Sequence, residues 1–375
     1  MGKYTLTGSQ AFDNLIDRQL MLVTEEILNL IPQKDIAAIL LGGGYGRGEG
    51  GVLIENDKEY LYNDYDLFVI LKNISYLKKK KYQNKIHLIH EKFTPLFKID
   101  VDVGPLQTVN AISNAPHWMM WYELKNGYKL LWGNKSIKSY FPDYSHEKMP
   151  IMEAYRLLLN RGVGLLLCKQ HFETYEETES QEFILRNIRK AQLAMGDAFL
   201  IKKERFHYSY KRRDEIFSEL KQDEDMLTLG IYDYYKIAYQ FKERPHKPNL
   251  SKEQYLTEYQ NTLQIYEALY CWIFTNKFSQ ELNLSDYQMI IDDIFTKDVN
   301  LKAKIKNIYK NVRFAKNKID NSMIIKHPRY RLFMTLPYFL FNKQEISCQK
   351  LLSCNNCTDN DDLLKIFLDL WEKNN

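Results

Sequence analysis

The sequence lacks any long apolar run. No stretch of its 375 residues approaches the eighteen consecutive apolar residues that a membrane-spanning helix needs. The first ten residues, MGKYTLTGSQ, also lack the apolar segment of a secretory signal, and Leu6 stands where a myristoylation signal after Gly2 requires Ser or Thr. These absences predict a protein with no membrane partner.

Cysteines are few, and there is little excess of either charge. The five cysteines are an odd number without an export signal, which favours a reducing, cytoplasmic location. Lys and Arg number 52 against 48 Asp and Glu, so the net charge of +4 is too small to indicate binding to duplex nucleic acid.

Glycines become scarce after about residue 148, and strand-like alternation ends there too. Before this point the pattern predicts a helix over 11–31, strands over 35–41, 63–71 and 97–103, a helix over 77–93 and a short strand near Trp132. After it, helical spacing predominates, over the ranges 151–167, 183–201, 225–241, 253–274, 287–295, 301–312 and 363–371. The sequence therefore predicts an α+β domain over 1–148, with a small mixed sheet and flanking helices, and an all-α domain over 149–375.

Chemistry-bearing residues concentrate between Ile39 and Ile70. An apolar run is followed by the glycine-rich segment GGGYGRGEGG at 42–51. Its glycines allow backbone N–H groups to approach an anion such as a triphosphate closely. The segment is not a Walker A loop, because no Gly-Lys-Ser/Thr follows, and it fits the dinucleotide fingerprint poorly. On its own, such a glycine-rich loop is a plain tight turn about as often as it is an anion-binding site.

Paired aspartates strengthen the case for a ligand site. Asp64 and Asp66 are two residues apart, as are Asp100 and Asp102, so each pair shares one face of its predicted strand. Four carboxylates on two apolar strands are costly to bury without cations. Two Mg²⁺ ions, which bind carboxylates together with substrate phosphates, would remove that cost. The alternative is that these aspartates lie at strand ends in water.

These segments resemble the DNA polymerase β-like nucleotidyltransferase superfamily over about residues 36–105. The run 43–49 is similar to its Gly-Ser-x-x-Arg-Gly-Glu signature, and the run 63–67 is similar to its Ser-Asp-x-Asp-Leu strand. The helical half is similar in layout, though not in motif, to the helical domain of antibiotic nucleotidyltransferases. Two departures stand out: Gly44 replaces the usual serine, and residues 52–62 form an insert, expected to be a hairpin near the acceptor.

The resemblance implies a role for each matching residue. Gly43, Gly44, Gly46 and Arg47 would hold the triphosphate of an NTP, with ATP the expected substrate. Asp64 and Asp66 would bind both metals. The third carboxylate, which would help to deprotonate the acceptor, is Asp102 or Asp100; the Gly104-Pro105 that follows favours Asp102. Residues 149–375 would bind the acceptor.

The expected activity is transfer of a nucleoside monophosphate from an NTP to a hydroxyl, with release of pyrophosphate. The acceptor is expected to be a small molecule or a protein side chain, and an RNA 3′ end is less favoured. A catalytically silent nucleotide-binding or partner-binding module is the alternative, and a homo-oligomer is possible in either case.

Weaker signals have ordinary structural explanations. Lys78–Lys81 is more typical of a solvated helix face than of an RNA contact. The run 208–213 indicates a helix-to-helix loop or part of the acceptor site. His117, beside Trp118 and Trp121, suggests a packed helix more than base stacking. Cys354 and Cys357 have half the spacing of a zinc site, without a second pair to complete it.

Overall fold

The computed structural model of the protein describes residues 2–144, 149–278, 282–296, 301–314, 321–344, 346–354, 357 and 359–374. The chain forms two compact units. The first comprises residues 1–153, 200–222 and 232–247, and the second comprises 154–199, 223–231 and 248–375. Two helical segments from the C-terminal half thus belong to the first unit, whereas the sequence predicts a single boundary after residue 148.

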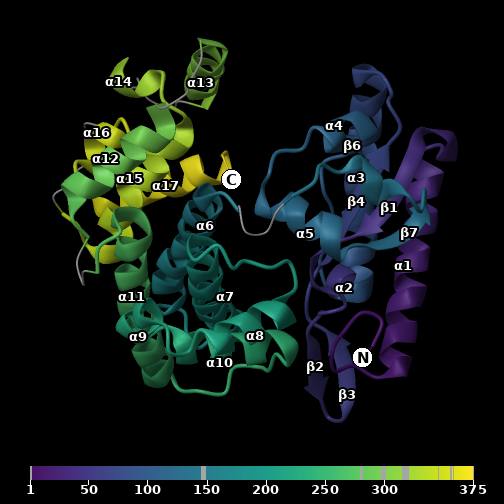
Figure 1. Ribbon diagram of the computed structural model, residues 1–375, viewed down its shortest axis with the longest axis horizontal. Coiled ribbons are helices and arrows are strands. Elements are labelled where there is room, and N and C mark those ends of the chain that lie inside the picture. The colour runs from purple at the N-terminus through teal and green to yellow at the C-terminus, as the bar shows by residue number, and fades with distance from the viewer. Residues whose placement is uncertain are drawn as a thin grey trace. The chain divides into compact units, whose positions relative to one another are not determined.

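A small mixed sheet forms the centre of the first unit (Figure 1). Its strands are β1 (Ile36–Leu41), β4 (Tyr65–Leu71), β5 (Val101–Val103), β6 (Gln107–Thr108) and β7 (Lys129–Gly133). The order is β5-β4-β1-β7, with β6 also pairing with β4. Strand β1 runs antiparallel to both neighbours, and β4 runs parallel to β5 and β6.

Strand β1 is an unbroken apolar run because both faces of the sheet are covered there. Ile39 and Leu41 belong to one core with helices α1 (Gln10–Leu30) and α3 (Tyr76–Phe97). Ala38 and Leu40 belong to a second core, with α4 (Val109–Ser113) and α5 (Met119–Gly127). Figure 1 shows α1 and α5 on opposite sides of the sheet.

Helix α1 shows how local sequence sets these elements. The Ser9 side chain accepts a hydrogen bond from the Phe12 N–H and so caps the helix N-terminus. Buried apolar side chains then recur every three or four residues and place one face of the helix on the core: Phe12, Ile16, Leu20, Val23 and Ile27.

The insert over residues 52–62 folds as the expected hairpin. Strand β2 (Val52–Glu55) pairs antiparallel with β3 (Lys58–Leu61). Asn56 and Asp57 form the two-residue turn, with φ of 49° and 59°. Positive φ at both central residues is the conformation that a tight two-residue β-hairpin turn of type I′ requires.

The first unit is completed by α2 (Gly43–Arg47), α8 (Tyr210–Glu219) and α10 (Tyr232–Glu243). The second unit is helical. Its main helices are α6 (Ile151–His171), α7 (Thr178–Lys202), α9 (Glu224–Leu229), α11 (Lys252–Thr275), α12 (Leu284–Thr296), α13 (Leu301–Phe314), α15 (Pro328–Phe341) and α17 (Asn360–Glu372), with single turns α14 (Asn321–Ile324) and α16 (Cys348–Leu351).

The predicted fold class is confirmed: α+β, with a small mixed sheet, flanking helices and a helical remainder. Two element predictions are wrong in part. The strand expected over 97–103 covers only Val101–Val103, because α3 continues to Phe97, where that ring packs on Phe93, and ends at Lys98 in the left-handed conformation. The helix expected over 225–241 is split at Gly230, which has φ 65°.

The polar segment 348–362 includes the single turn α16, and α17 begins at Asn360. Among the described helices, none combines the length and the hydropathy needed to cross a bilayer.

Candidate functional site

The glycine loop follows β1 along the chain and lies against β4 at Asp66. The Gly42 N–H donates to the Asp66 carbonyl oxygen at 2.8 Å. Gly43 has φ 59°, and a Cβ there would overlap the Asp66 carboxylate. A Cβ at Gly46 would overlap the Leu41 carbonyl oxygen. Glycine at position 43 therefore places the loop backbone directly against a carboxylate, and glycine at position 46 allows the loop to lie against the end of β1.

Tyr45 holds the far side of the loop. Its ring is fully buried and lies 5.4 Å from the Tyr65 ring, and its hydroxyl donates to the Gly51 carbonyl at 3.2 Å. The same hydroxyl accepts from the Tyr62 N–H, and the Asn63 side chain accepts from the Gly51 N–H at 2.6 Å. The loop is thus fixed by hydrogen bonds at the end remote from Asp66.

Asp66 and Asp102 lie side by side. They are paired in register on the parallel strands β4 and β5, so their side chains share one face of the sheet. Among the residues that the structure describes, neither carboxylate has a hydrogen-bond donor or an ion-pair partner. We call these two residues the carboxylate pair.

The other two predicted carboxylates flank the pair. Asp64 precedes β4 and Asp100 precedes β5, whose first pairing includes a hydrogen bond from the Tyr65 N–H to the Asp100 carbonyl. Asp100 and Asp102 are both exposed, while Asp64 and Asp66 are partly buried. Of the two candidates for the third carboxylate, Asp102 is the one in register with Asp66.

Burial and neighbouring carboxylates both raise the pKa of Asp66. Burial, followed by the charge of Asp64, raises the pKa of Asp66 to about 6. Asp102 contributes in the same direction, and Arg47 and Lys242 act against it. A carboxylate surrounded by carboxylates is the environment in which a bound cation is most stabilising.

Mg²⁺ fits the chemistry of these donors, although no closed cage is present. No group of three His, Cys, Asp or Glu within the described ranges is arranged to hold a metal ion. Mg²⁺, however, uses one or two carboxylates together with substrate phosphates and water. The unpaired, adjacent Asp66 and Asp102 supply that partial set.

Arg47 belongs to a network of matched charges. Its guanidinium lies 3.1 Å from Glu123 and 3.4 Å from Glu49. Arg213, which is fully buried, forms an ion pair with the other oxygen of Glu123. We call Arg47, Glu49, Glu123 and Arg213 the Arg47 cluster; its two guanidinium groups are balanced by two carboxylates.

Glu49 ties the glycine loop to helix α8. It accepts hydrogen bonds from the Ser209 hydroxyl at 2.5 Å, from the Tyr210 N–H at 3.0 Å and from the Lys211 N–H at 3.2 Å. Burial raises the pKa of Glu49, but the Ser209 hydrogen bond and the Arg47 charge outweigh it, and the pKa lies below its usual range. Glu49 therefore stays ionised at a helix N-terminus, where a negative charge is favoured.

Lys242 is a partly buried cation that feels the charges of Glu49 and Glu123 without forming an ion pair with either. Its Nζ lies over the Tyr210 ring at 4.4 Å and, within the described part of the chain, makes no hydrogen bond or ion pair. Burial and the charge of Arg47 lower the pKa of Lys242 to about 8. Its charge in turn lowers the pKa of Asp66, so Lys242 lies near the carboxylate pair.

Sequence reasoning did not identify Glu123 or Lys242. Both are far from the motifs along the chain, and no local pattern distinguishes them from surface charges. The run 208–213, considered as a possible part of the acceptor site, supplies Arg213 to the Arg47 cluster, and its Ser209 and Tyr210 contact cluster members Glu49 and Arg213. It begins helix α8 rather than forming only a loop.

The weaker motifs are accounted for by packing and surface exposure. Lys78 pairs with Asp35 at 2.8 Å, and Lys80 and Lys81 are exposed. The His117 ring stacks on Tyr144 at 5.1 Å, and Trp121 is buried.

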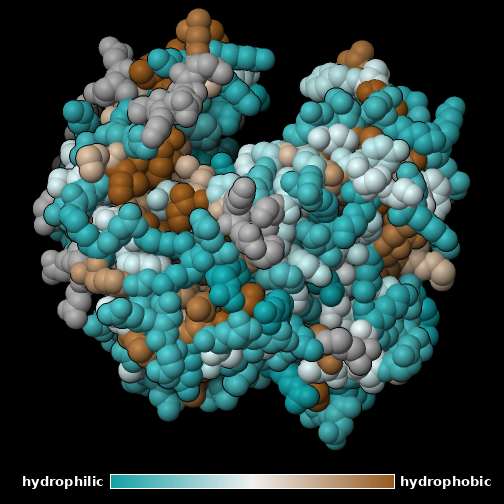
Figure 2. Space-filling model, in the orientation of Figure 1, coloured by the Kyte–Doolittle hydropathy of each residue, from teal (hydrophilic) through white to brown (hydrophobic). Residues whose placement is uncertain are grey.

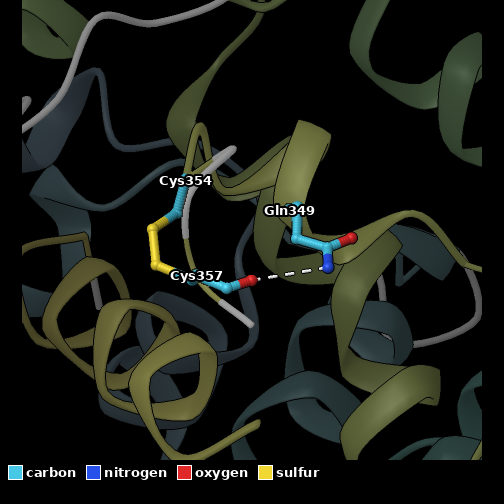
Figure 3. The surroundings of a disulfide bond; sticks show 3 residues. All are labelled: Gln349, Cys354 and Cys357. Carbon is cyan, nitrogen blue, oxygen red and sulfur yellow. Dashed lines mark hydrogen bonds between the residues drawn. A yellow bond between two sulfur atoms is a disulfide. The ribbon is translucent and has the colours of Figure 1, made fainter. Parts of the chain in front are cut away.

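Cys354 and Cys357 are joined in a disulfide (Figure 3), with Gln349 donating to the Cys357 carbonyl. Cys168, Cys271 and Cys348 are buried and take no part in a disulfide.

Comparisons with known proteins add one weak similarity. No protein-family model matches the sequence, and no curated protein matches it. Among solved structures, a match is found to the spectinomycin adenyltransferase AAD(9) from Enterococcus faecialis, determined with ATP and spectinomycin. The identity is 10%, the TM-score is 0.38, and the match covers 66% of this chain and 98% of that one. A similarity at this level carries no argument about the chemistry.

Proposed function

We propose that the protein is a nucleotidyltransferase that moves a nucleoside monophosphate from an NTP to an acceptor hydroxyl. The observation that carries the proposal is the pair of carboxylates without an ion pair among the described residues, Asp66 and Asp102, which lie side by side, with Asp66 against the backbone of Gly43. A Gly-rich backbone is suited to an anion, whereas an unpaired carboxylate pair is suited to a cation. Both are satisfied together by a metal–nucleotide complex.

Each residue has a role in this proposal. The backbone at Gly43 and Gly44 approaches the phosphates, and Gly46 allows the loop to close on β1. Asp64 and Asp66 are the proposed metal ligands, with Asp102 as third carboxylate. When bound, Mg²⁺ neutralises phosphate charge and lowers the pKa of a coordinated hydroxyl.

In this proposal Lys242 makes the phosphate contact that the resemblance gives to the side chain of Arg47. The guanidinium of Arg47 is already engaged by Glu123 and Glu49, so its proposed role is to hold the loop and α8 in place. Lys242 has no such partner and is proposed to bind the phosphates of the leaving pyrophosphate.

The proposed reaction is a balanced displacement. The acceptor oxygen attacks the α-phosphorus, a new P–O bond forms, and the bond from that phosphorus to the β-phosphate bridging oxygen breaks. Asp102 accepts the hydroxyl proton, and pyrophosphate leaves with its charge near Lys242. The helical residues 149–375 are proposed to select the acceptor, with a small molecule or a protein side chain preferred over an RNA 3′ end.

The test is incubation of the purified protein with each of the four NTPs labelled at the α-phosphate, with Mg²⁺ and a panel of hydroxyl-bearing acceptors. Label transferred to a soluble product or a protein band, and lost in Asp66→Asn and Asp102→Asn, supports the proposal. Tight NTP binding without pyrophosphate release for any acceptor would instead indicate a silent nucleotide-binding module.

A further inference from the structure

Helix α13 distributes its side chains in an unusual way. The side chains that it buries are polar: Asn307 is 6% exposed and Asn311 is 1% exposed. The Asn311 amide donates to the carbonyl oxygens of Ile324 and Lys326, at 2.8 Å each, and its own oxygen accepts from Arg331 at 3.0 Å. These hydrogen bonds fix the rotation of the helix about its axis.

The apolar side chains of α13 consequently face outward. They recur at intervals of four, three, one and three residues, which places them on one stripe of a helix. Their exposed fractions are 74% for Leu301, 59% for Ile305, 36% for Ile308, 61% for Tyr309 and 61% for Val312. Figure 2 shows hydrophobic side chains at the surface in the region where Figure 1 draws α13. We call these five residues the α13 stripe.

Basic side chains border the α13 stripe. Lys302, Lys306 and Arg313 follow it on one side of the helix and Lys304 lies on the other, and all four are exposed. The sequence 301–314, LKAKIKNIYKNVRF, contains no acidic residue. An apolar stripe with basic borders is the pattern of a helix that lies in the surface of an anionic bilayer.

We propose that α13 docks on an anionic lipid bilayer, lying in the plane of the headgroups with the α13 stripe buried and the basic side chains on lipid phosphates. A bilayer accepts the convex face of a single helix without a shaped groove. A second copy of the chain would bring like charges together across a two-fold contact. Nucleic acid would match the basic residues but leave the apolar stripe in water.

This inference concerns the second unit and is independent of the proposed chemistry. It revises the expectation of no membrane partner, which rests on the absence of a spanning segment. Surface docking needs only one exposed amphipathic helix.

The experiment is co-sedimentation of the full chain with vesicles of phosphatidylcholine alone or of phosphatidylcholine mixed with phosphatidylglycerol. The wild type should bind the anionic vesicles at least about tenfold more tightly than the neutral ones. Ile305→Ser/Val312→Ser should lose most binding to both, and Lys302→Glu/Lys306→Glu should lose the preference for anionic lipid. Lys80→Glu/Lys81→Glu on α3, with the same change in net charge, should bind like the wild type.

Circular dichroism establishes that each variant is folded, and the exposed positions make large losses of structure unexpected. The proposal is overturned if the wild type binds neither vesicle, or if both α13 variants bind as tightly as the α3 variant. A stable dimer in light scattering that dissociates in Ile305→Ser/Val312→Ser would identify a second copy as the occupant and would equally overturn it.

Discussion

Two groups of charged residues lie close together in the first unit and differ in how their charges are matched. In the Arg47 cluster, Glu123 and Glu49 balance Arg47 and Arg213. In the carboxylate pair, Asp66 and Asp102 have no partner among the described residues. Matched charges satisfy one another and hold the fold, whereas unmatched like charges are retained at a cost that a ligand removes. We therefore propose that the first group is structural and that the second takes part in the chemistry.

The largest effect expected from this comparison is on activity. Asp66→Asn and Asp102→Asn should each lower kcat by at least about 10²-fold, because the variants remove charge that is used at the reacting phosphate. Pyrophosphate release under saturating NTP measures it. Asp100→Asn is the matched control, since it removes a carboxylate from the same end of β5. An equal loss there would show that the register of Asp66 with Asp102 does not identify the third carboxylate.

The largest effect on stability is expected in the Arg47 cluster. Glu123→Gln leaves two guanidinium groups without their shared carboxylate and should lower the free energy of unfolding by about 3 kcal/mol. Urea denaturation followed by circular dichroism measures the change. Glu215→Gln, which removes an exposed partner of Arg212 on the surface of α8, should change stability by less than about 1 kcal/mol. Similar midpoints for the two variants would contradict the structural role of the cluster.

In the absence of ligand, removing a charge from the carboxylate pair should raise the free energy of unfolding, whereas removing a charge from the Arg47 cluster should lower it. The folded pKa of Asp66 is raised to about 6, so ionised Asp66 destabilises the fold at neutral pH. Asp66→Asn should therefore be more stable than the wild type at pH 7, by about 1–2 kcal/mol. The difference should shrink as the pH falls from 6 to 4 and be lost below the unfolded pKa of 3.8, where Asp66 is protonated in both states. A variant less stable than the wild type at pH 7 would mean that Asp66 is matched after all.

Lys242 is expected to give a smaller effect, on binding. Lys242→Met should weaken NTP binding about tenfold, because it removes a charge-assisted contact to phosphate. Wild-type affinity should also fall above pH 8, since the pKa of Lys242 in the free protein is about 8. Lys242→Arg keeps the charge at all these pH values and should remove the fall. Calorimetric titration at pH 7 and pH 9 distinguishes the three proteins, and a fall that persists in Lys242→Arg would exclude Lys242 as its source.

Residue patterns within single helices and strands predicted those parts of the site that depend on neighbours along the chain. The two-residue spacing of Asp64 and Asp66 predicted a shared strand face, and the helix over 11–31 followed from apolar periodicity and ends at Leu30. The register that brings Asp102 beside Asp66 is a property of strand pairing across a helix, and no residue marks it. The third strand was predicted too long because Ile99 and Val101 continue an alternation that the end of α3 interrupts.

Residue patterns within single helices and strands could not predict contacts between residues that are far apart in the sequence. Glu123 is 76 residues from Arg47, and Glu49 is 160 residues from Ser209, yet both pairs form hydrogen bonds. The sequence placed Arg47 on the phosphates from its position in the glycine loop. Only the packing of α5 and α8 shows that its guanidinium is engaged by Glu123 and Glu49, and that Lys242 forms no ion pair with either.

The most direct measurement is mass spectrometry of an acceptor panel after incubation with ATP and Mg²⁺, using the wild type and Asp66→Asn/Asp102→Asn. The account predicts one product heavier than its acceptor by a nucleoside monophosphate, formed with an equal amount of pyrophosphate by the wild type and undetected with the double variant. Equal product from both proteins would contradict it, because the unmatched carboxylates would then take no part in the reaction.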